Sequence, residues 1–257
     1  MNLIDTHTHL FSEQFDEDRN TIVQSAIAAG VTKMLLPNID LASIESMHQM
    51  EQDFPEHCFA MMGMHPCSVT DNWSEDKKVI KEHLFSRNYV AVGEIGMDLY
   101  WDKTTLGVQQ EAFADQIEWA KELGLPIVIH VRDAFDEAFE IVDALNDDQL
   151  TGVFHCFTGT LAQAKHILNY GGFKLGMGGV LTFKNSGLDK VVNDLDLQDL
   201  ILETDSPYLA PHPNRGKRNE SSYITYVASK LAEVKGVSIE EVAAITSANA
   251  TELFKLN

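Results

Sequence analysis

The chain has 257 residues, of which 44% are hydrophobic, so it has enough apolar side chains for one large core and does not look disordered. Acidic residues outnumber basic ones by 39 to 19, and a formal net charge of −20 excludes polyanion binding by overall attraction; any nucleic-acid role needs a local basic patch or bound cations. The three cysteines have no repeated spacing, so we expect no disulfide framework. The chain has neither a signal-peptide pattern nor a run of about 18 apolar residues, so we expect a cytoplasmic protein without a membrane span.

Eight short apolar runs are predicted to be β-strands. They are rich in Val, Ile, Leu and Met and do not alternate with polar residues, which is typical of parallel strands buried on both faces. These runs cover residues 3–5, 33–36, 59–63, 90–94, 126–130, 152–155, 173–177 and 200–203.

Longer segments with apolar residues at helical spacing separate many of these runs. The predicted helices cover residues 19–29, 111–123, 133–145, 160–170, 223–234 and 239–256. The first two are followed by Gly30 and Gly124, and glycine is favoured just after the end of a helix.

Strands alternating with helices predict an α/β fold with a parallel sheet, and eight strands are enough to close a barrel. We therefore expect one (β/α)₈ TIM-barrel hydrolase domain over residues 1–257. The alternative, an open doubly wound sheet, would normally carry a glycine-rich phosphate fingerprint after its first strand. This chain has Asp-Thr-His-Thr-His there instead.

Potential metal ligands gather where the predicted strands end. In a barrel these ends converge on one face, and that face carries the active site. The pair in His-x-His points to one side, because alternate residues of a strand do so. The strand-end residues are His7, His9, Glu94, His130, His155, Glu203 and Asp205.

Imidazoles together with carboxylates indicate a divalent metal site. This set exceeds what one tetrahedral ion needs, so a binuclear site with ions roughly 3.5–4 Å apart is expected. Glu94 can bridge the two ions because a carboxylate offers two oxygens. The residue types fit Mg, Mn or Zn and do not separate them.

Further residues near the strand ends are candidates for substrate binding. His65 lies in Gly-Met-His-Pro, where a structural loop histidine is the alternative, and Arg132 can hold a phosphate or form a rim ion pair. Arg215, Lys217 and Arg218 form the densest basic cluster in the chain, for anion capture or as a solvated loop.

A cysteine nucleophile has little support in the sequence. Cys156 directly follows His155, but adjacent strand residues face opposite sides, so we expect Cys156 to pack outward. The chain contains neither a Gly-x-Ser-x-Gly elbow nor a Gly-x-x-x-x-Gly-Lys phosphate loop.

Seven motifs, spread over nearly the whole chain, resemble the TatD family of metal-dependent hydrolases, often described as TatD-related deoxyribonucleases. They are Asp-Thr-His-Thr-His-Leu (5–10), Gly-Met-His-Pro (63–66), Gly-Glu-Ile-Gly-Met-Asp (93–98), Pro-Ile-Val-Ile-His-Val-Arg (126–132), His-Cys-Phe-Thr-Gly (155–159), Glu-Thr-Asp-Ser-Pro-Tyr-Leu-Ala-Pro (203–211) and Asn-Arg-Gly-Lys-Arg-Asn-Glu (214–220).

The resemblance implies an amidohydrolase-type barrel that hydrolyses DNA phosphodiesters with divalent metals, as a 3′-to-5′ exonuclease on single strands or 3′ ends. Ser221, where the family commonly has proline, and Met97, where leucine is usual, are its small departures. The implied metal ligands are His7, His9, Glu94, His130, His155 and Asp205.

The resulting hypothesis assigns each residue a role. His7, His9 and Asp205 hold one ion, His130 and His155 hold the other, and Glu94 bridges them. A metal-activated water attacks phosphorus. Asp205 receives its proton with Glu203 in support, and nearby arginine or lysine side chains stabilise the developing charge.

Two other functions remain open at the level of sequence. A carbon-centre ester, lactone, amide or aminoacyl-tRNA bond can be attacked by the same activated water. Phosphotriesterase-like barrels, however, bridge their metals with a carboxylated lysine where this chain has Glu94. The second alternative function is binding of metal or nucleic acid without catalysis. DNA-binding proteins are usually basic, however, and this chain is acidic. The polar, acidic chain is compatible with a monomer.

Overall fold

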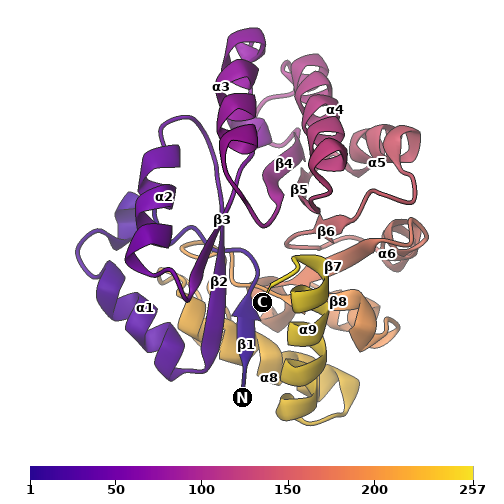
Figure 1. The fold of residues 1–257 in the computed structure, drawn as a ribbon. Helices are drawn as coiled ribbons and strands as arrows, with labels where there is room; N and C mark the ends of the chain where they lie inside the picture. Colours follow the sequence, from indigo (N-terminus) through magenta and orange to yellow (C-terminus); the bar gives the residue numbers. More distant parts are fainter. Residues whose placement is uncertain (257) are drawn as a thin grey trace.

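The computed structural model of the protein describes residues 1–256, and eight parallel strands form its centre (Figure 1). Each of the eight predicted strands overlaps one of them. The strands are β1 (Leu3–Asp5), β2 (Val31–Pro37), β3 (Cys58–Met61), β4 (Val92–Asp98), β5 (Ile127–Arg132), β6 (Gly152–Phe154), β7 (Phe173–Met177) and β8 (Leu200–Leu202).

Helices follow the strands along the chain and surround them (Figure 1). The sequence predicted six of these helices and missed α2, α3 and α7, and it began α4 five residues late. The helices are α1 (Arg19–Ala28), α2 (Ile44–Asp53), α3 (Trp73–Ser86), α4 (Leu106–Leu123), α5 (Phe135–Leu145), α6 (Leu161–Leu168), α7 (Leu188–Asn193), α8 (Ile224–Lys235) and α9 (Ile239–Leu253).

Backbone hydrogen bonds close the strands into a ring. Regular parallel ladders join neighbouring strands in two series, β1–β2–β3 and β4–β5–β6–β7–β8. Between β3 and β4, Gly93 N donates to Met62 O at 3.1 Å; between β1 and β8, Thr6 N donates to Leu202 O at 3.1 Å. The predicted (β/α)₈ architecture is confirmed.

The inside of the barrel is filled by one apolar layer and closed at one end by α9. Asn249 of α9 donates to Leu197 O and Leu200 O at the start of β8, so this helix covers the end where the strands begin. The opposite end, where the strands finish, is left for a site. The interior cluster contains Ile4, Leu35, Met61, Ala91, Val128, Val153, Ile201, Ala250, Leu253, Phe254 and Leu256.

Residues 1–256 include no helix that is both long enough and apolar enough to span a membrane. The thiols of Cys58, Cys67 and Cys156 are free.

Candidate metal centre

The seam between β1 and β8 positions the His-x-His pair. Asp205 N donates to His7 O at 2.9 Å, and His9 N donates to Ser206 O at 2.7 Å. The hydroxyls of Thr8 and Ser206 lie 2.6 Å apart on the other side of the strand. His7 and His9, which follow β1, both face Glu94, so the two imidazoles lie on one side as the His-x-His spacing predicted.

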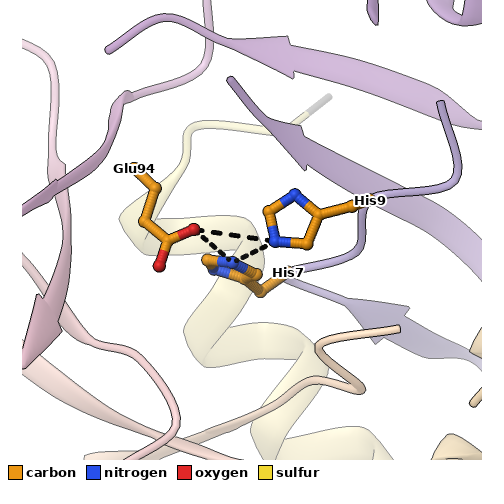
Figure 2. A group of neighbouring side chains, drawn as sticks. All are labelled: His7, His9 and Glu94. Atoms are coloured by element: carbon orange, nitrogen blue, oxygen red, sulfur yellow. Dashed lines mark hydrogen bonds and ion pairs between the residues drawn. The ribbon is translucent and has the colours of Figure 1, made fainter. Parts of the chain in front are cut away.

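Glu94 lies at the centre of the cluster and is only 2% exposed. Its Oε2 lies 3.1 Å from His7 Nε2 and 3.6 Å from His9 Nε2 (Figure 2). Its two oxygens face two different sets of imidazoles, an arrangement that allows one carboxylate to contact two cations. The set around Oε1 consists of His155 Nε2 at 2.9 Å, His130 Nδ1 at 3.0 Å and His65 Nε2 at 3.4 Å.

Asp205 joins the His7 and His9 side of the cluster. Its Oδ1 lies 3.6 Å from His9 Nε2 and 3.9 Å from His7 Nε2. The residue has a φ of 57°, a left-handed conformation that non-glycine residues rarely adopt and that is concentrated at functional sites. Burial opposes ionisation of Asp205, but the nearby imidazoles of His9 and His155 hold the pKa of its carboxyl below the usual value.

Glu203 is fully buried behind His155. Its Oε1 accepts from Cys156 N and lies 3.4 Å from His155 Nδ1, while Oε2 has no hydrogen-bond partner among the described residues. The absence of a side chain at Gly176 makes room for it, because a Cβ there would lie 2.3 Å from Glu203 Oε2. Glu203 thus orients a histidine of the cluster from behind, a placement compatible with the supporting role predicted for it.

Asp98, at the end of β4, is a site residue that the sequence analysis did not identify. Its Oδ2 lies 2.9 Å from His130 Nε2, so the other ring nitrogen, Nδ1, faces Glu94. Burial opposes the charge of Asp98, but the hydrogen bond from His130 lowers the pKa of Asp98 to about 2. The same contact, with Glu94, raises the pKa of His130 despite its burial. Glu94 and Asp98 are four residues apart on one strand, and side chains at i and i+4 of a strand point to the same face. This spacing was the sequence signal that could have identified Asp98.

The chemistry of this donor set fits divalent cations. Burial disfavours the ionised form of Glu94, yet the surrounding His65, His7 and His155 hold the pKa of Glu94 well below its usual value. Burial lowers the pKa of His7, which favours the neutral imidazole. His7 Nε2 and His9 Nε2 lie 3.3 Å apart and face the same carboxylate oxygen. Lone pairs of imidazoles and carboxylates that converge this closely are what Zn, Mn or related ions bind.

The residues predicted to bind substrate lie in different places. His65 and Arg132 line the cavity over the cluster. Arg215 stacks its guanidinium 3.5 Å from the centre of the Phe183 ring, and Lys217 is exposed; neither lines that cavity. Arg218 is held elsewhere by Asp18, Gln14 and the Phe15 ring.

A cavity of about 770 Å³ opens directly over the cluster, with Glu94, His130, His155 and Asp205 in its lining. Cys156 also lines it, so the expected outward packing of this residue was wrong. Strand β6 ends at Phe154, and Cys156 has a left-handed φ of 44°, so the alternation of a strand no longer applies at this position. Burial raises the pKa of its thiol well above the ordinary value, which does not favour a nucleophilic thiolate.

Known proteins are similar to this chain over nearly its whole length. The family model described as TatD related DNase matches residues 4–255. The chain is 40% identical to the uncharacterized metal-dependent hydrolase YabD of Bacillus subtilis, over 99% of this chain and 100% of YabD. It is 31% identical to the 3′-5′ ssDNA/RNA exonuclease TatD of Citrobacter rodentium, over 98% of this chain and 97% of that protein.

A solved structure is similar as well. YJJV, a TatD homologue from Escherichia coli K12, superposes with a TM-score of 0.90 at 29% identity, over 99% of this chain and 98% of that one. The resemblance expected from the seven sequence motifs is confirmed by the family match.

Proposed function

The chain belongs to the family of TatD-related DNases, a family of metal-dependent hydrolases, and we propose that it is a divalent-metal-dependent exonuclease that shortens single-stranded DNA from the 3′ end. The observation that carries the proposal is the position of Glu94, whose two oxygens face separate sets of imidazoles beneath an open cavity. The exonuclease named above, similar over nearly its full length, supports the choice of a phosphodiester over other esters.

The proposed metal ligands fall into two sets around the carboxylate of Glu94. When bound, a pair of divalent ions offsets the negative charge of a phosphodiester and makes water acidic enough to attack at neutral pH. The first ion would be held by His7, His9 and Asp205, the second by His130 and His155, and Glu94 would contact both.

Asp205 would accept the proton of the attacking water. Its side chain is 14% exposed, against 3% for Glu94 and none for Glu203, so water in the cavity reaches Asp205 more readily. Glu203 would act through His155, whose Nδ1 lies 3.4 Å from Glu203 Oε1. Asp98 does the same for His130, and both carboxylates therefore hold imidazoles in place.

Hydrolysis of an end-labelled single-stranded oligonucleotide tests the proposal. Wild type and His130→Ala are compared in Mg²⁺, Mn²⁺ or EDTA. We expect stepwise shortening from the 3′ end that requires metal and falls by several orders of magnitude in the variant. A folded, metal-containing protein that cleaves no oligonucleotide would contradict the proposal and direct the search to carbon-centre esters.

A further inference from the structure

Trp101 is an exposed aromatic residue at the mouth of the catalytic cavity. It is 71% exposed, the largest fraction among the large hydrophobic residues of the described chain, and it lines the same cavity as Glu94 and His130. Leaving an indole in water forgoes the favourable burial of a large apolar side chain. An exposed aromatic surface that adjoins a binding site is a candidate for contact with the ligand.

The loop that carries Trp101 is tied to the end of β4 and the start of α4. Asp98 Oδ1 accepts from Tyr100 N at 3.0 Å, and Leu99 N donates to Arg132 O at 3.0 Å. Gln109 of α4 accepts from Asp98 N and donates to Asp98 O, both at 2.9 Å. The exposure of the indole is thus built into a supported loop, and little conformational entropy is lost when a ligand stacks on it.

Two neighbours fix the orientation of the indole. The Tyr100 ring meets it edge-on, with ring centroids 4.8 Å apart and an interplanar angle of 90°. The guanidinium of Arg132 lies 3.8 Å from the centre of the Tyr100 ring and 5.4 Å from that of Trp101. The three side chains, which we call the aromatic platform, place one positive charge beside a flat apolar surface.

We propose that the aromatic platform (Tyr100, Trp101 and Arg132) stacks the nucleobase of the nucleotide next to the scissile phosphodiester. This proposal rests on the proposed nuclease function. Every nucleobase has a flat π-face, so stacking on Trp101 holds a strand without selecting its sequence. Among the described residues, Arg132 is the only arginine or lysine that lines this cavity, so the side-chain charge there attracts a polyanion weakly. Tyr208 also lines the cavity, but its ring lies 6.1 Å from His9 and belongs to the metal side.

Tryptophan fluorescence tests the stacking without turnover. Trp73 and Trp119 are buried, at 1% and 7% exposure, so a ligand on the surface quenches chiefly Trp101. Single-stranded oligothymidylate is titrated in EDTA, with its binding followed separately by the anisotropy of a dye on its 5′ end. We expect saturable quenching in wild type and none in Trp101→Phe. Binding without quenching, or no binding in EDTA, would overturn the proposal.

A substrate without bases provides the second test. We expect Trp101→Ala to raise KM about 5- to 100-fold on a normal oligonucleotide, with a smaller effect on kcat. Wild type should show a similar rise on an oligonucleotide whose 3′-terminal residues are abasic, and the variant should not distinguish the two substrates. The control is Phe85→Ala, an exposed aromatic beneath Lys81 on α3, outside the cavity lining.

The outcomes separate this proposal from the nuclease function. Metal-dependent cleavage with equal KM for abasic and normal ends would overturn the stacking proposal and leave the nuclease standing. Quenching that depends on Trp101 without cleavage in any metal would leave a base-binding platform and remove the nuclease.

Discussion

At the scale of single residues, the cluster is organised by carboxylates that do different work. Glu94 faces imidazoles on both sides, Asp205 faces the cavity, and Asp98 and Glu203 each hold one histidine from behind. An imidazole that contacts a metal through one nitrogen is oriented by what the other nitrogen contacts. The site therefore depends on residues that need not touch a metal or the substrate.

Asp98→Asn tests this dependence. The amide cannot carry the negative charge that raises the pKa of His130, so His130 loses orientation and basicity. We expect metal affinity or kcat/KM to fall about 10- to 100-fold, measured by metal titration and by oligonucleotide hydrolysis. Asp143→Asn is the matched control, since Asp143 holds His166 in the same way, at 2.8 Å on the surface. Equal effects in both variants would remove the positioning role of Asp98.

The sequence predicted the central residues because each stands at or just beyond the end of an apolar run, and strand ends converge in a barrel. In the structure His155 and Asp205 follow their strands, whereas Glu94 and His130 lie inside β4 and β5. It did not predict Asp98, because strand β4 continues to Asp98 while the apolar run ends earlier. The position of Cys156 was also beyond sequence reasoning, since its left-handed backbone breaks the alternation. Periodicity in the sequence describes only regular strands and helices. Strand β4 continues to Asp98 beyond its apolar run, and strand β6 ends before Cys156.

At the scale of elements, close packing between β7 and β8 leaves no room for a side chain at Gly176. We expect Gly176→Ala to displace Glu203 or His155, because the added Cβ would lie 2.3 Å from Glu203 Oε2 and 3.0 Å from His155 Cα. Overpacking of this kind costs about 1–3 kcal/mol of unfolding free energy and should also lower kcat. Urea unfolding and hydrolysis rates measure both.

Gly107→Ala is the control for that substitution. Gly107 lies in the first turn of α4, and a Cβ there meets no atom within 4 Å. Alanine should be neutral or stabilising there by up to about 1 kcal/mol, since it favours a helix more than glycine does. If Gly176→Ala behaved like Gly107→Ala, the close approach of the two strands would not matter.

The loop after β8 is joined to the segment before α1 by Arg218 and Asp18. Arg218 Nη1 and Nη2 donate to the two oxygens of Asp18 at 2.9 and 2.6 Å. The hydrogen bond from Arg218 lowers the pKa of Asp18. The pair therefore adds stability above the unfolded pKa, about 3.9, and that contribution is lost as pH falls through the lower folded pKa.

Asp18→Asn should accordingly lower the urea midpoint at neutral pH, and its difference from wild type should shrink as the pH falls from about 5 toward 2. Glu56→Gln, at an exposed carboxylate, provides the control. A difference that stayed constant over this range would show that the charge of Asp18 contributes nothing.

The missed helices α2 and α3 are more polar overall than the six predicted helices, and α7 has only six residues. Burial does not distinguish the two groups, because the missed α2 and the predicted α1 each bury three of their ten residues. Such polar or short helices form because the barrel supplies a surface for a few side chains, and their sequences do not reveal that surface.

At the scale of the whole molecule, a net charge of −20 surrounds a cavity whose described lining includes a single arginine or lysine, Arg132. Each phosphate contact on a single strand adds about −0.7 to the slope of log affinity against log salt. One contact predicts that KM rises less than about threefold between 50 and 200 mM NaCl at saturating metal. Oligonucleotide hydrolysis across this range measures the slope. A rise of a hundredfold would instead indicate a basic path outside the cavity.

We propose that Glu94 would contact two divalent ions in one site. Metal content per chain, measured on wild type and Glu94→Gln after titration of the metal-free protein with Mn²⁺ or Zn²⁺, tests it most directly. We expect two ions per wild-type chain and activity that appears as both sites fill. In Glu94→Gln we expect the loss of at least one ion and of nearly all hydrolysis. Two ions and full activity in the variant would contradict it.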